Sequence, residues 1–353
     1  MIQYMSAREA AEKWNISHRR VSILCAESRI PNVAMLGNMW LIPRDAEKPV
    51  DARFKSAAVK DFAHPFVKWA GGKGQLIEVL KSNLPEGIGT SIRKYAEPMV
   101  GGGALLFALL NEYNFDEVYI NDNNKELINT FTVVRDKCSA LILELKNIQE
   151  EYSKLNITQQ QEYYYQKRDE FNNILLNEDT AIIKAVLFIF LNRTCFNGLY
   201  RVNKAGKFNV PAGKYKNPLI CDEKNLSKIS SLLQSVKIQS CDYHDVESFA
   251  DSFTFVYIDP PYRPLNKASF TSYTEEQFTD KDQIELAGFF KTLSDKGTKI
   301  MLSNSDPWNV DYEDKFFDEL YKDYNIQRIT AVRNINSKAD KRGNVTELLI
   351  KNY

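Results

Sequence analysis

Four consecutive residues, Asp259-Pro260-Pro261-Tyr262, combine groups that could do chemistry. They directly follow an apolar, β-rich stretch, residues 253–258, so we expect them at the carboxyl end of a buried strand, where open α/β sheets bind their ligands. Two consecutive prolines would make this turn rigid. A carboxylate, a backbone carbonyl and an aromatic face in one rigid turn suit the handling of an amine on a planar ring, because each N–H of the amine needs an acceptor.

The amine on an aromatic base is a poor nucleophile, because its lone pair is delocalised into the ring. The Asp259 carboxylate and the Pro260 carbonyl can each accept one N–H, which draws the nitrogen toward tetrahedral geometry with its lone pair facing a methyl donor. Tyr262 can stack on the base, and a base paired in a duplex must be flipped out to reach it. A merely rigid turn would not require Asp259 and Tyr262, so the turn predicts methylation of an exocyclic amine.

A glycine turn, Glu97-Pro98-Met99-Val100-Gly101-Gly102-Gly103, follows a short predicted strand and precedes a helical apolar run. Glycines such as Gly101 and Gly103 let a nucleotide approach the backbone closely. Asp122 stands about twenty residues further on, after a second predicted strand, where an acid takes ribose hydroxyls in doubly wound folds. The turn lacks both the P-loop ending and a strict Gly-x-Gly-x-x-Gly pattern, which favours a nucleoside cofactor over NAD or ATP. Glu97, Gly101, Gly103 and Asp122 are therefore predicted cofactor contacts.

A second glycine-containing segment, Phe66-Val67-Lys68-Trp69-Ala70-Gly71-Gly72-Lys73, lies upstream. On its own it could be mistaken for a phosphate loop. If it folds beside the glycine turn, the Trp69 indole can cover the cofactor and Lys73 can meet a carboxylate of the cofactor. The alternative is that Trp69 is an ordinary tryptophan of the core.

Residues 1–50 are predicted to form a helix-turn-helix module. Ser6 and Glu9 have the spacing of a capping box for one helix, Ser17 can cap a second, and the Gly37-Asn38 turn indicates a hairpin. The order resembles a small winged helix-turn-helix of the excisionase kind. Three arginines would lie on or beside the second helix, where a DNA-reading helix needs them: Arg19, Arg20 and Arg29. The alternative is a packing module that never touches DNA.

Residues 51–64 are predicted to be a charged linker, followed by one larger α/β unit. Strands alternate with helices over residues 65–140 and 234–353, which predicts a doubly wound, mainly parallel Rossmann-like sheet. Residues 141–233 interrupt this order, because they are helical at first and then rich in Gly, Asn and basic residues. We interpret them as an inserted, helical and hairpin-containing region that recognises the substrate.

Lys plus Arg and Asp plus Glu both number 46, so a nucleic-acid surface must come from local segregation of charge. Residues 180–221 contain no acidic residue, which makes them the best candidate for a phosphate-facing surface. Their basic residues are Lys184, Arg193, Arg201, Lys204, Lys207, Lys214 and Lys216.

The five cysteines are scattered without a Cys-x-x-Cys pair, and the three histidines lie far apart. This suits neither a disulfide framework nor a structural zinc, so we expect no metal. The longest apolar run, residues 185–191, is far too short to span a bilayer, and the first residues lack the order of a signal peptide. We therefore expect a protein of the reducing cytoplasm with no membrane partner.

Four motifs follow one another along the chain: Lys-Trp-Ala-Gly-Gly-Lys (68–73), Glu-Pro-Met-Val-Gly-Gly-Gly (97–103), Asn-Asp-Asn (121–123) and Asp-Pro-Pro-Tyr (259–262). Together they resemble the Dam-type (class alpha) family of DNA adenine-N6 methyltransferases. The likeness extends to residues 191–193, 196–201 and 206–211, which are similar to the target-recognition hairpin of that family, and to residues 303–305 and 342–349, which are similar to its closing segments. It covers roughly residues 65–353.

The resemblance implies a methyltransferase core (65–140 and 234–353) that uses S-adenosylmethionine, and a target-recognition domain (141–233) that acts on double-stranded DNA, within GATC. It implies cofactor contacts from Trp69, Lys73, Asp122 and Asp259, and a flipped adenine held by Asp259, Pro260 and Tyr262. The family pattern departs here at Met99, where an aromatic is common, and in the presence of residues 1–50, which its minimal form lacks.

The resemblance also implies which residues meet DNA. Lys68 and Arg201 would touch bases, with Asn197, Leu199 and Pro211 beside them. Arg201 could pair in a two-pronged manner with guanine, which would make it a specificity residue. Phe196 stands where an aromatic could wedge into the opened duplex, although the same residue could equally belong to the core.

Two other functions stay open from the sequence. Methylation of cytosine N4, or of adenine in RNA, would use the same turn, since it serves any planar exocyclic amine. A DNA-binding regulator with a vestigial methyltransferase fold would work through residues 1–50, but intact Asp259, Tyr262, Asp122 and Lys73 argue against decay. A restriction endonuclease acting separately would be a compatible partner, and the residues do not specify an oligomeric state.

Overall fold

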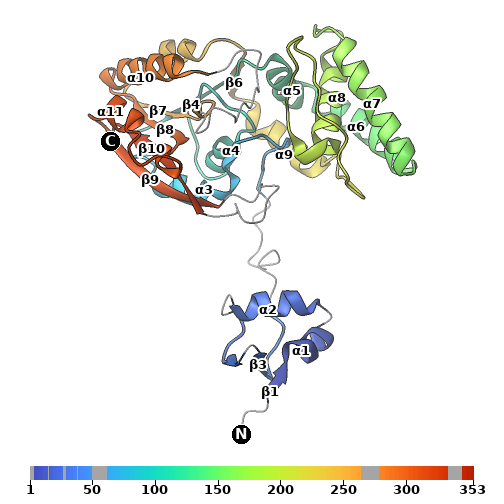
Figure 1. The fold of residues 1–353 in the computed structure, drawn as a ribbon. Helices are drawn as coiled ribbons and strands as arrows, with labels where there is room; N and C mark the ends of the chain where they lie inside the picture. The colour runs from blue at the N-terminus through green and yellow to red at the C-terminus, as the bar shows by residue number, and fades with distance from the viewer. Residues whose placement is uncertain are drawn as a thin grey trace. The chain divides into compact units, whose positions relative to one another are not determined.

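The computed structural model describes residues 4–14, 16–26, 29–37, 39–49, 62–263, 278–332 and 344–353. These residues fall into two compact units, Met1–Asp61 and Phe62–Tyr353 (Figure 1). Residues 51–61 of the predicted linker, 51–64, lie outside the described residues. Asn38 of the predicted hairpin turn and residues 342 and 343 of the closing segment also lie outside them.

The described part of the first unit contains two helices and a small antiparallel sheet in the strand order β1-β3-β2. Its elements are β1 (Tyr4–Ser6), α1 (Ala7–Trp14), α2 (His18–Ala26), β2 (Ala34–Leu36) and β3 (Met39–Pro43). The capping box forms, because the Ser6 N–H donates to Glu9 Oε2 (2.7 Å) and the Glu9 N–H to Ser6 Oγ (3.3 Å). Strand β1 was not expected from the sequence, because it pairs with the distant β3.

The second unit is built on a sheet of seven described strands in the order β6-β5-β4-β7-β8-β10-β9. The first five strands in this order, β6, β5, β4, β7 and β8, are parallel to their neighbours. Strand β10 runs antiparallel to both β8 and β9. The strands are β4 (Lys94–Glu97), β5 (Glu117–Asn121), β6 (Val236–Gln239), β7 (Thr254–Ile258), β8 (Lys299–Ser305), β9 (Asn325–Val332) and β10 (Asn344–Lys351). The sheet is thus mainly parallel, as the alternation of strands and helices predicts.

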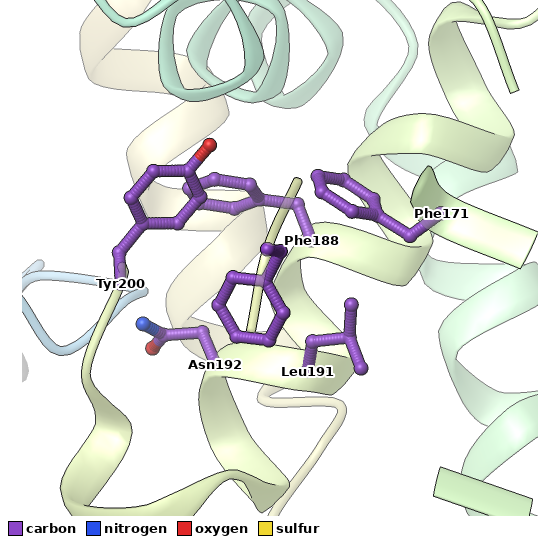
Figure 2. A pocket seen from close by; sticks show the side chains of 6 residues that line it. Phe171, Phe188, Leu191, Asn192 and Tyr200 are labelled. Carbon is purple, nitrogen blue, oxygen red and sulfur yellow. The ribbon is translucent and has the colours of Figure 1, made fainter. Parts of the chain in front are cut away.

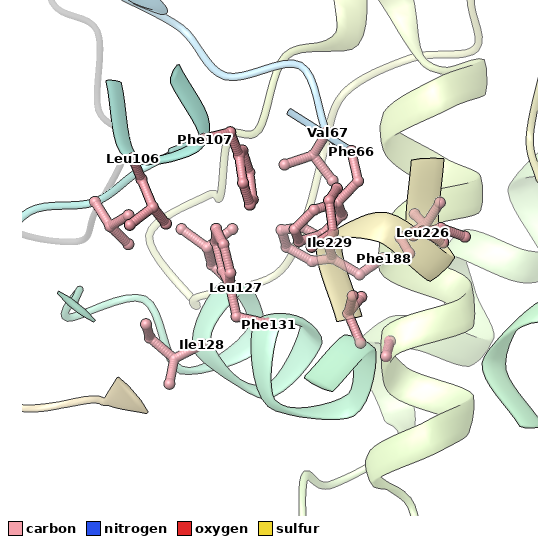
Figure 3. Close-up of a cluster of buried hydrophobic side chains, with 14 of the residues drawn as sticks. Phe66, Val67, Leu106, Phe107, Leu127, Ile128, Phe131, Phe188, Leu226 and Ile229 are labelled. Carbon is pink, nitrogen blue, oxygen red and sulfur yellow. The ribbon is translucent and has the colours of Figure 1, made fainter. Parts of the chain in front are cut away.

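Helices cover both faces of this sheet, and alternate residues of one strand serve opposite faces. On β7, Phe255 and Tyr257 join a cluster with residues of α4 (Ala104–Leu110) and α5 (Lys125–Asp136). The intervening Val256 and Ile258 join a second cluster with α10 (Asp280–Asp295) and α11 (Phe316–Leu320). Figure 3 shows part of the first cluster, where Phe66 meets Phe131 with ring centroids 4.9 Å apart. The central strands are therefore buried on both sides.

The remaining helices begin with a short 3₁₀ helix, Lys73–Gln75, and α3 (Ile77–Ser82). Helices α6 (Cys138–Ser153), α7 (Ile157–Asn173) and α8 (Ala181–Thr194) gather at one side of the second unit, beyond α5 and α9 (Figure 1). Helix α9 (Glu223–Leu233) places Leu226 and Ile229 in the same cluster as Phe66, so it packs with the sheet-covering helices as well as with α6. The segment between α8 and α9 forms the hairpin described below.

Candidate active site

The carboxyl ends of β4, β5 and β7 lie next to one another, since β4 pairs in parallel with both β5 and β7. The chain proceeds from β4 to β5 on one side of β4, and reaches β7 on the other side only later. Ligands bind at such switch points in open α/β sheets. The glycine turn, Asp122 and the Asp-Pro-Pro-Tyr turn follow these three strands, so the fold brings the predicted cofactor and catalytic residues to one edge.

The glycine turn is braced by Asp122. Its Oδ2 accepts the Gly101 N–H (3.0 Å) and its Oδ1 accepts the Asn124 N–H (3.0 Å). Burial raises the pKa of Asp122, and these two backbone donors oppose the rise. Gly103 has φ +69° and caps α4, while Gly101 has φ +49°. Asp122 therefore shapes the turn, in addition to the ribose contact predicted for it.

Trp69 explains why the turn needs glycine. A Cβ at Gly101 would lie 2.8 Å from Trp69 Cδ1, closer than side-chain atoms approach one another. On the hairpin side, the indole stacks on Tyr200 at a centroid distance of 5.6 Å. Trp69 is half-buried, so it is not a fully buried tryptophan of the core. It forms a wall between the glycine turn and the hairpin.

Asn121 ties three strand ends together, although sequence reasoning singled out only its neighbour Asp122. The Asn121 amide donates to the carbonyls of Pro98 (3.1 Å) and Cys241 (3.0 Å), and its oxygen accepts the Cys241 N–H (2.8 Å). The side chain is buried. A polar residue at the end of an otherwise apolar predicted strand was the signal that could have identified it.

Lys73 and Asp259 form an ion pair inside the site. Lys73 Nζ lies 2.8 Å from Asp259 Oδ1, donates to the Gly71 carbonyl (2.7 Å), and lies 4.6 Å from the centroid of the Tyr262 ring. The lysine side chain is only 4% exposed. Burial raises the pKa of Asp259, and the Lys73 ammonium opposes that rise. The carboxylate and the tyrosine face thus converge on one nitrogen.

The Asp-Pro-Pro-Tyr turn is also held from behind. Gln283 of α10 donates to the Pro261 carbonyl (3.1 Å), and Asn304 at the end of β8 donates to Gln283 Oε1 (2.9 Å). Gln283 and Asn304 are completely buried. Pro260 is buried too, whereas Pro261 is exposed. These contacts fix the orientation of the Asp259 carboxylate and the Pro260 carbonyl without using either group.

Tyr262 has a partner that the sequence did not reveal. Its hydroxyl donates to Glu347 Oε2 of β10 (2.7 Å), across 85 positions of the chain. Burial raises the pKa of Tyr262 well above its ordinary value, and the charges of Asp259 and Glu347 raise it further. The tyrosine therefore stays neutral and its ring plane is held from its outer end.

Glu97, a predicted cofactor contact, is 2% exposed and accepts a hydrogen bond from the Tyr95 hydroxyl. Burial raises the pKa of Glu97 to about 8, and the charge of Asp259 adds to the rise. The carboxyl group is therefore mostly protonated at neutral pH. A neutral Glu97 adds no second negative charge beside Asp259.

The hairpin that follows α8 carries the predicted DNA contacts. Cys195 and Ala212 form one antiparallel bridge and Val202 and Phe208 another. Within it the Phe196 N–H donates to the Pro211 carbonyl (2.8 Å), and the exposed Arg201 donates through Nε to Asn209 Oδ1 (2.8 Å). The structure thus gathers Phe196, Asn197, Leu199, Arg201 and Pro211 in one hairpin. Phe196 is 51% exposed, which rules out the core role considered for it.

Of the basic residues predicted to form a phosphate-facing surface, one is buried and another is only partly exposed. Lys184 is buried and donates to the Phe171 carbonyl (2.9 Å), and burial lowers its pKa. Arg193 is partly buried, and burial lowers its pKa. Both lie on α8, most of whose residues are buried, Lys184 among them. The exposed basic residues of this segment are Arg201, Lys204, Lys207, Lys214 and Lys216.

Within the part of the chain that the structure describes, no group of three or more His, Cys, Asp or Glu side chains is placed to hold a metal ion. Nor does any helix among those residues have the length and apolar character needed to cross a membrane.

The mainly parallel sheet with its antiparallel β10 and the ligand-facing turns are consistent with the Rossmann-like fold of methyltransferases. Comparison with known proteins then gives the family. Residues 69–335 match the family described as D12 class N6 adenine-specific DNA methyltransferase. The chain therefore belongs to this family, and it is an adenine-specific DNA methyltransferase.

Individual relatives cover most of the chain. A Type II methyltransferase, M.MjaIII, from Methanocaldococcus jannaschii is 49% identical, over 82% of this chain and 99% of that protein. A Type II methyltransferase, M1.LlaDCHI, from Lactococcus lactis is 40% identical, over 82% of this chain and 95% of that protein. The DNA adenine methylase of Escherichia coli K12 is 33% identical, over 80% of this chain and 93% of that protein. The resemblance to Dam-type enzymes is thereby confirmed at the level of the family.

Proposed function

We propose that this protein transfers a methyl group from S-adenosylmethionine to N6 of an adenine flipped out of double-stranded DNA, within GATC. The observation that carries the proposal is the placement of Lys73 Nζ, 2.8 Å from Asp259 Oδ1 and 4.6 Å from the Tyr262 ring centroid. The turn thus already receives an N–H donor between its carboxylate and its aromatic face, which is what an exocyclic amine requires.

The residues around the glycine turn fit a nucleoside cofactor. Gly101 leaves the backbone bare beside Trp69, and Asp122 has lone pairs beyond the two backbone bonds it accepts. When bound, S-adenosylmethionine supplies an electrophilic methyl group. Trp69, Lys73, Glu97, Gly101, Gly103, Asp122 and Asp259 are the residues proposed to line its site.

The adenine amine is proposed to replace the Lys73 ammonium at Asp259. Asp259 and the Pro260 carbonyl accept the two N–H groups, which concentrates the nitrogen lone pair on the side of the methyl donor. Tyr262, steadied by Glu347, offers its face to the flipped base in place of the lost stacking. Lys73 is then free to meet the carboxylate of the cofactor.

DNA recognition is assigned to the exposed side of the hairpin and to the segment before Trp69. We assign Lys68 and Arg201 to base contacts, Phe196 to the opened base step, and Asn197, Leu199 and Pro211 to positions beside them. Lys68, Phe196, Asn197, Arg201 and Pro211 are exposed, which such contacts require. Arg19 is exposed on α2, so the first unit is proposed to add a DNA contact of its own.

The test incubates the full chain with labelled S-adenosylmethionine and with duplexes that contain or lack GATC, and then digests the products to nucleosides. We expect label in N6-methyladenine from GATC duplexes. Label in N4-methylcytosine, or label only with RNA, would overturn the proposed target. Equal labelling of duplexes without GATC would overturn the proposed sequence while leaving the chemistry intact.

Removing residues 1–50 should weaken DNA binding, and unchanged affinity and site choice would show that this unit is not a DNA reader.

A further inference from the structure

Three asparagines of the described residues hold the segment that leads to Trp69, each by binding one backbone N–H and the carbonyl of the same residue. Asn111 holds Ala63 (3.1 and 2.8 Å), and Asn225 holds His64 (3.0 and 2.8 Å). Asn192 holds Lys68 in the same way (2.7 and 2.8 Å). A side-chain amide that donates and accepts in this way imitates a neighbouring strand.

Asn192 makes one further contact that links this segment to the hairpin. Its amide nitrogen also donates to the Gly198 carbonyl (3.2 Å), in the loop between Phe196 and Leu199. The further bond of the Asn111 amide stays within its own helix, to the Phe107 carbonyl (2.6 Å). Figure 2 shows Asn192 on α8 with its amide directed toward the segment that carries Tyr200. One buried amide thus sits between the two places assigned to base contacts.

Gly198 and Lys68 are in direct contact. Gly198 has φ +64°, and a Cβ at this position would lie 2.3 Å from Lys68 Cδ. On its other side, Lys68 Nζ approaches the Tyr215 hydroxyl (3.4 Å) and lies 4.6 Å from the centroid of that ring. The stem of the lysine therefore passes between the loop of the hairpin and Tyr215, and its direction depends on where Gly198 lies.

The Asn192 side chain is 4% exposed, so its polar atoms depend on these partners. The orientation of the amide follows from them, because an N–H faces its oxygen and two carbonyls face its nitrogen. An aspartate would keep the acceptor for the Lys68 N–H but would set a carboxylate against both carbonyls. The site therefore requires an amide and is intolerant of a charge.

We propose that Asn192 is a positioning residue for sequence discrimination: it fixes the spacing between Lys68 and the Phe196–Arg201 part of the hairpin. The inference rests on the proposed function, in which these residues read bases. A base reader must be placed to within a fraction of a hydrogen-bond length, so moving Lys68 relative to Arg201 lowers the preference for the correct base pair.

The experiment compares Asn192→Asp with the matched control Asn225→Asp, which places the same charge at an equally buried clamp on the same segment. For each protein, kcat/KM is measured on the duplex that the wild type methylates and on duplexes with one base pair changed. Asn192→Asp should lower the ratio of cognate to changed duplex about tenfold. Asn225→Asp should leave that ratio within about twofold, whatever it does to the melting temperature.

Gly198→Ala provides a second variant that leaves the buried amide in place. Its Cβ would displace the Lys68 stem, so we expect the same loss of discrimination even if Asn192→Asp does not fold. An unchanged ratio in Gly198→Ala, or in folded Asn192→Asp, would overturn the proposal, as would an equal loss in Asn225→Asp. If the wild type transfers no label to adenine, the proposed function itself fails. A wild type that labels adenine without any preference for neighbouring bases would overturn the positioning role alone.

Discussion

The catalytic turn and the recognition hairpin are held in opposite ways. The turn follows a strand whose five residues are all buried, and completely buried side chains of α10 and β8 support it from behind. The hairpin projects exposed side chains, and apart from its own backbone bonds it is held by polar side chains of the neighbouring helices, Asn192 at Gly198 and Asn172 at Phe208 among them. Chemistry therefore depends on a rigid arrangement that tolerates little change, whereas recognition depends on a surface whose effects should be graded.

The largest effect should come from the turn. Asp259→Ala removes the acceptor for the amine, and we expect methyl transfer to fall by at least about a thousandfold. DNA binding, measured by gel shift at fixed salt, should largely survive. Asp259→Asn is the companion variant, because it keeps the volume and removes only the charge. Near-normal turnover in Asp259→Ala would show that another group localises the lone pair. In Asp259→Asn the amide oxygen can still accept an N–H, so its turnover measures what the charge alone contributes.

The glycine turn should give the next largest effect. Gly101→Ala forces an alanine into the left-handed region and brings its Cβ to within 2.8 Å of Trp69 Cδ1, so we expect S-adenosylmethionine affinity to fall about tenfold or more. Calorimetric titration measures it. Gly74→Ala is the control, since a Cβ there has no atom within 4 Å. Equal affinities for the two variants would show that the cofactor does not bind at this turn.

On the hairpin, a graded effect is expected. Arg201→Ala should relax the preference for one guanine about tenfold, because a two-pronged contact contributes roughly 1–3 kcal/mol of discrimination. Lys204→Ala, at another exposed basic position of the hairpin, should weaken binding to all duplexes alike and reduce the salt dependence. Competition between duplexes of known sequence separates the two. A uniform loss for Arg201→Ala would make it a phosphate contact.

The last effect concerns stability rather than methyl transfer, and it comes from the buried acid beside the turn. The pKa of Glu97 is raised to about 8, so the folded protein keeps a proton that the unfolded chain loses near 4.5. This carboxyl group therefore stabilises the fold at low pH, and its contribution declines as pH rises from about 4.5 to about 8. Glu97→Gln should remove that decline while keeping an acceptor for Tyr95. Melting temperatures of the two proteins between pH 5 and pH 9 test it, and parallel curves would contradict the prediction.

Much of the fold and of the catalytic turn could be predicted because those signals are local. The capping box at Ser6 and Glu9, the apolar strand before Asp259 and the glycine turn are each specified by neighbouring residues. Strand β1 was missed because its partner lies in β3. Lys184 was wrongly expected on the surface, because the exposure of a charge depends on what packs around α8.

The sequence by itself determined the residue types needed for amine chemistry, their order along the chain and the alternation of strands and helices that places them at one edge. Only the tertiary structure decided which partners complete them. Glu347 reaches Tyr262 from another strand, and Asn192 joins Lys68 to Gly198 from the end of a helix. Such pairings have no local pattern, because they arise when the sheet register and helix packing bring distant polar groups into a buried place where each needs a hydrogen-bond partner.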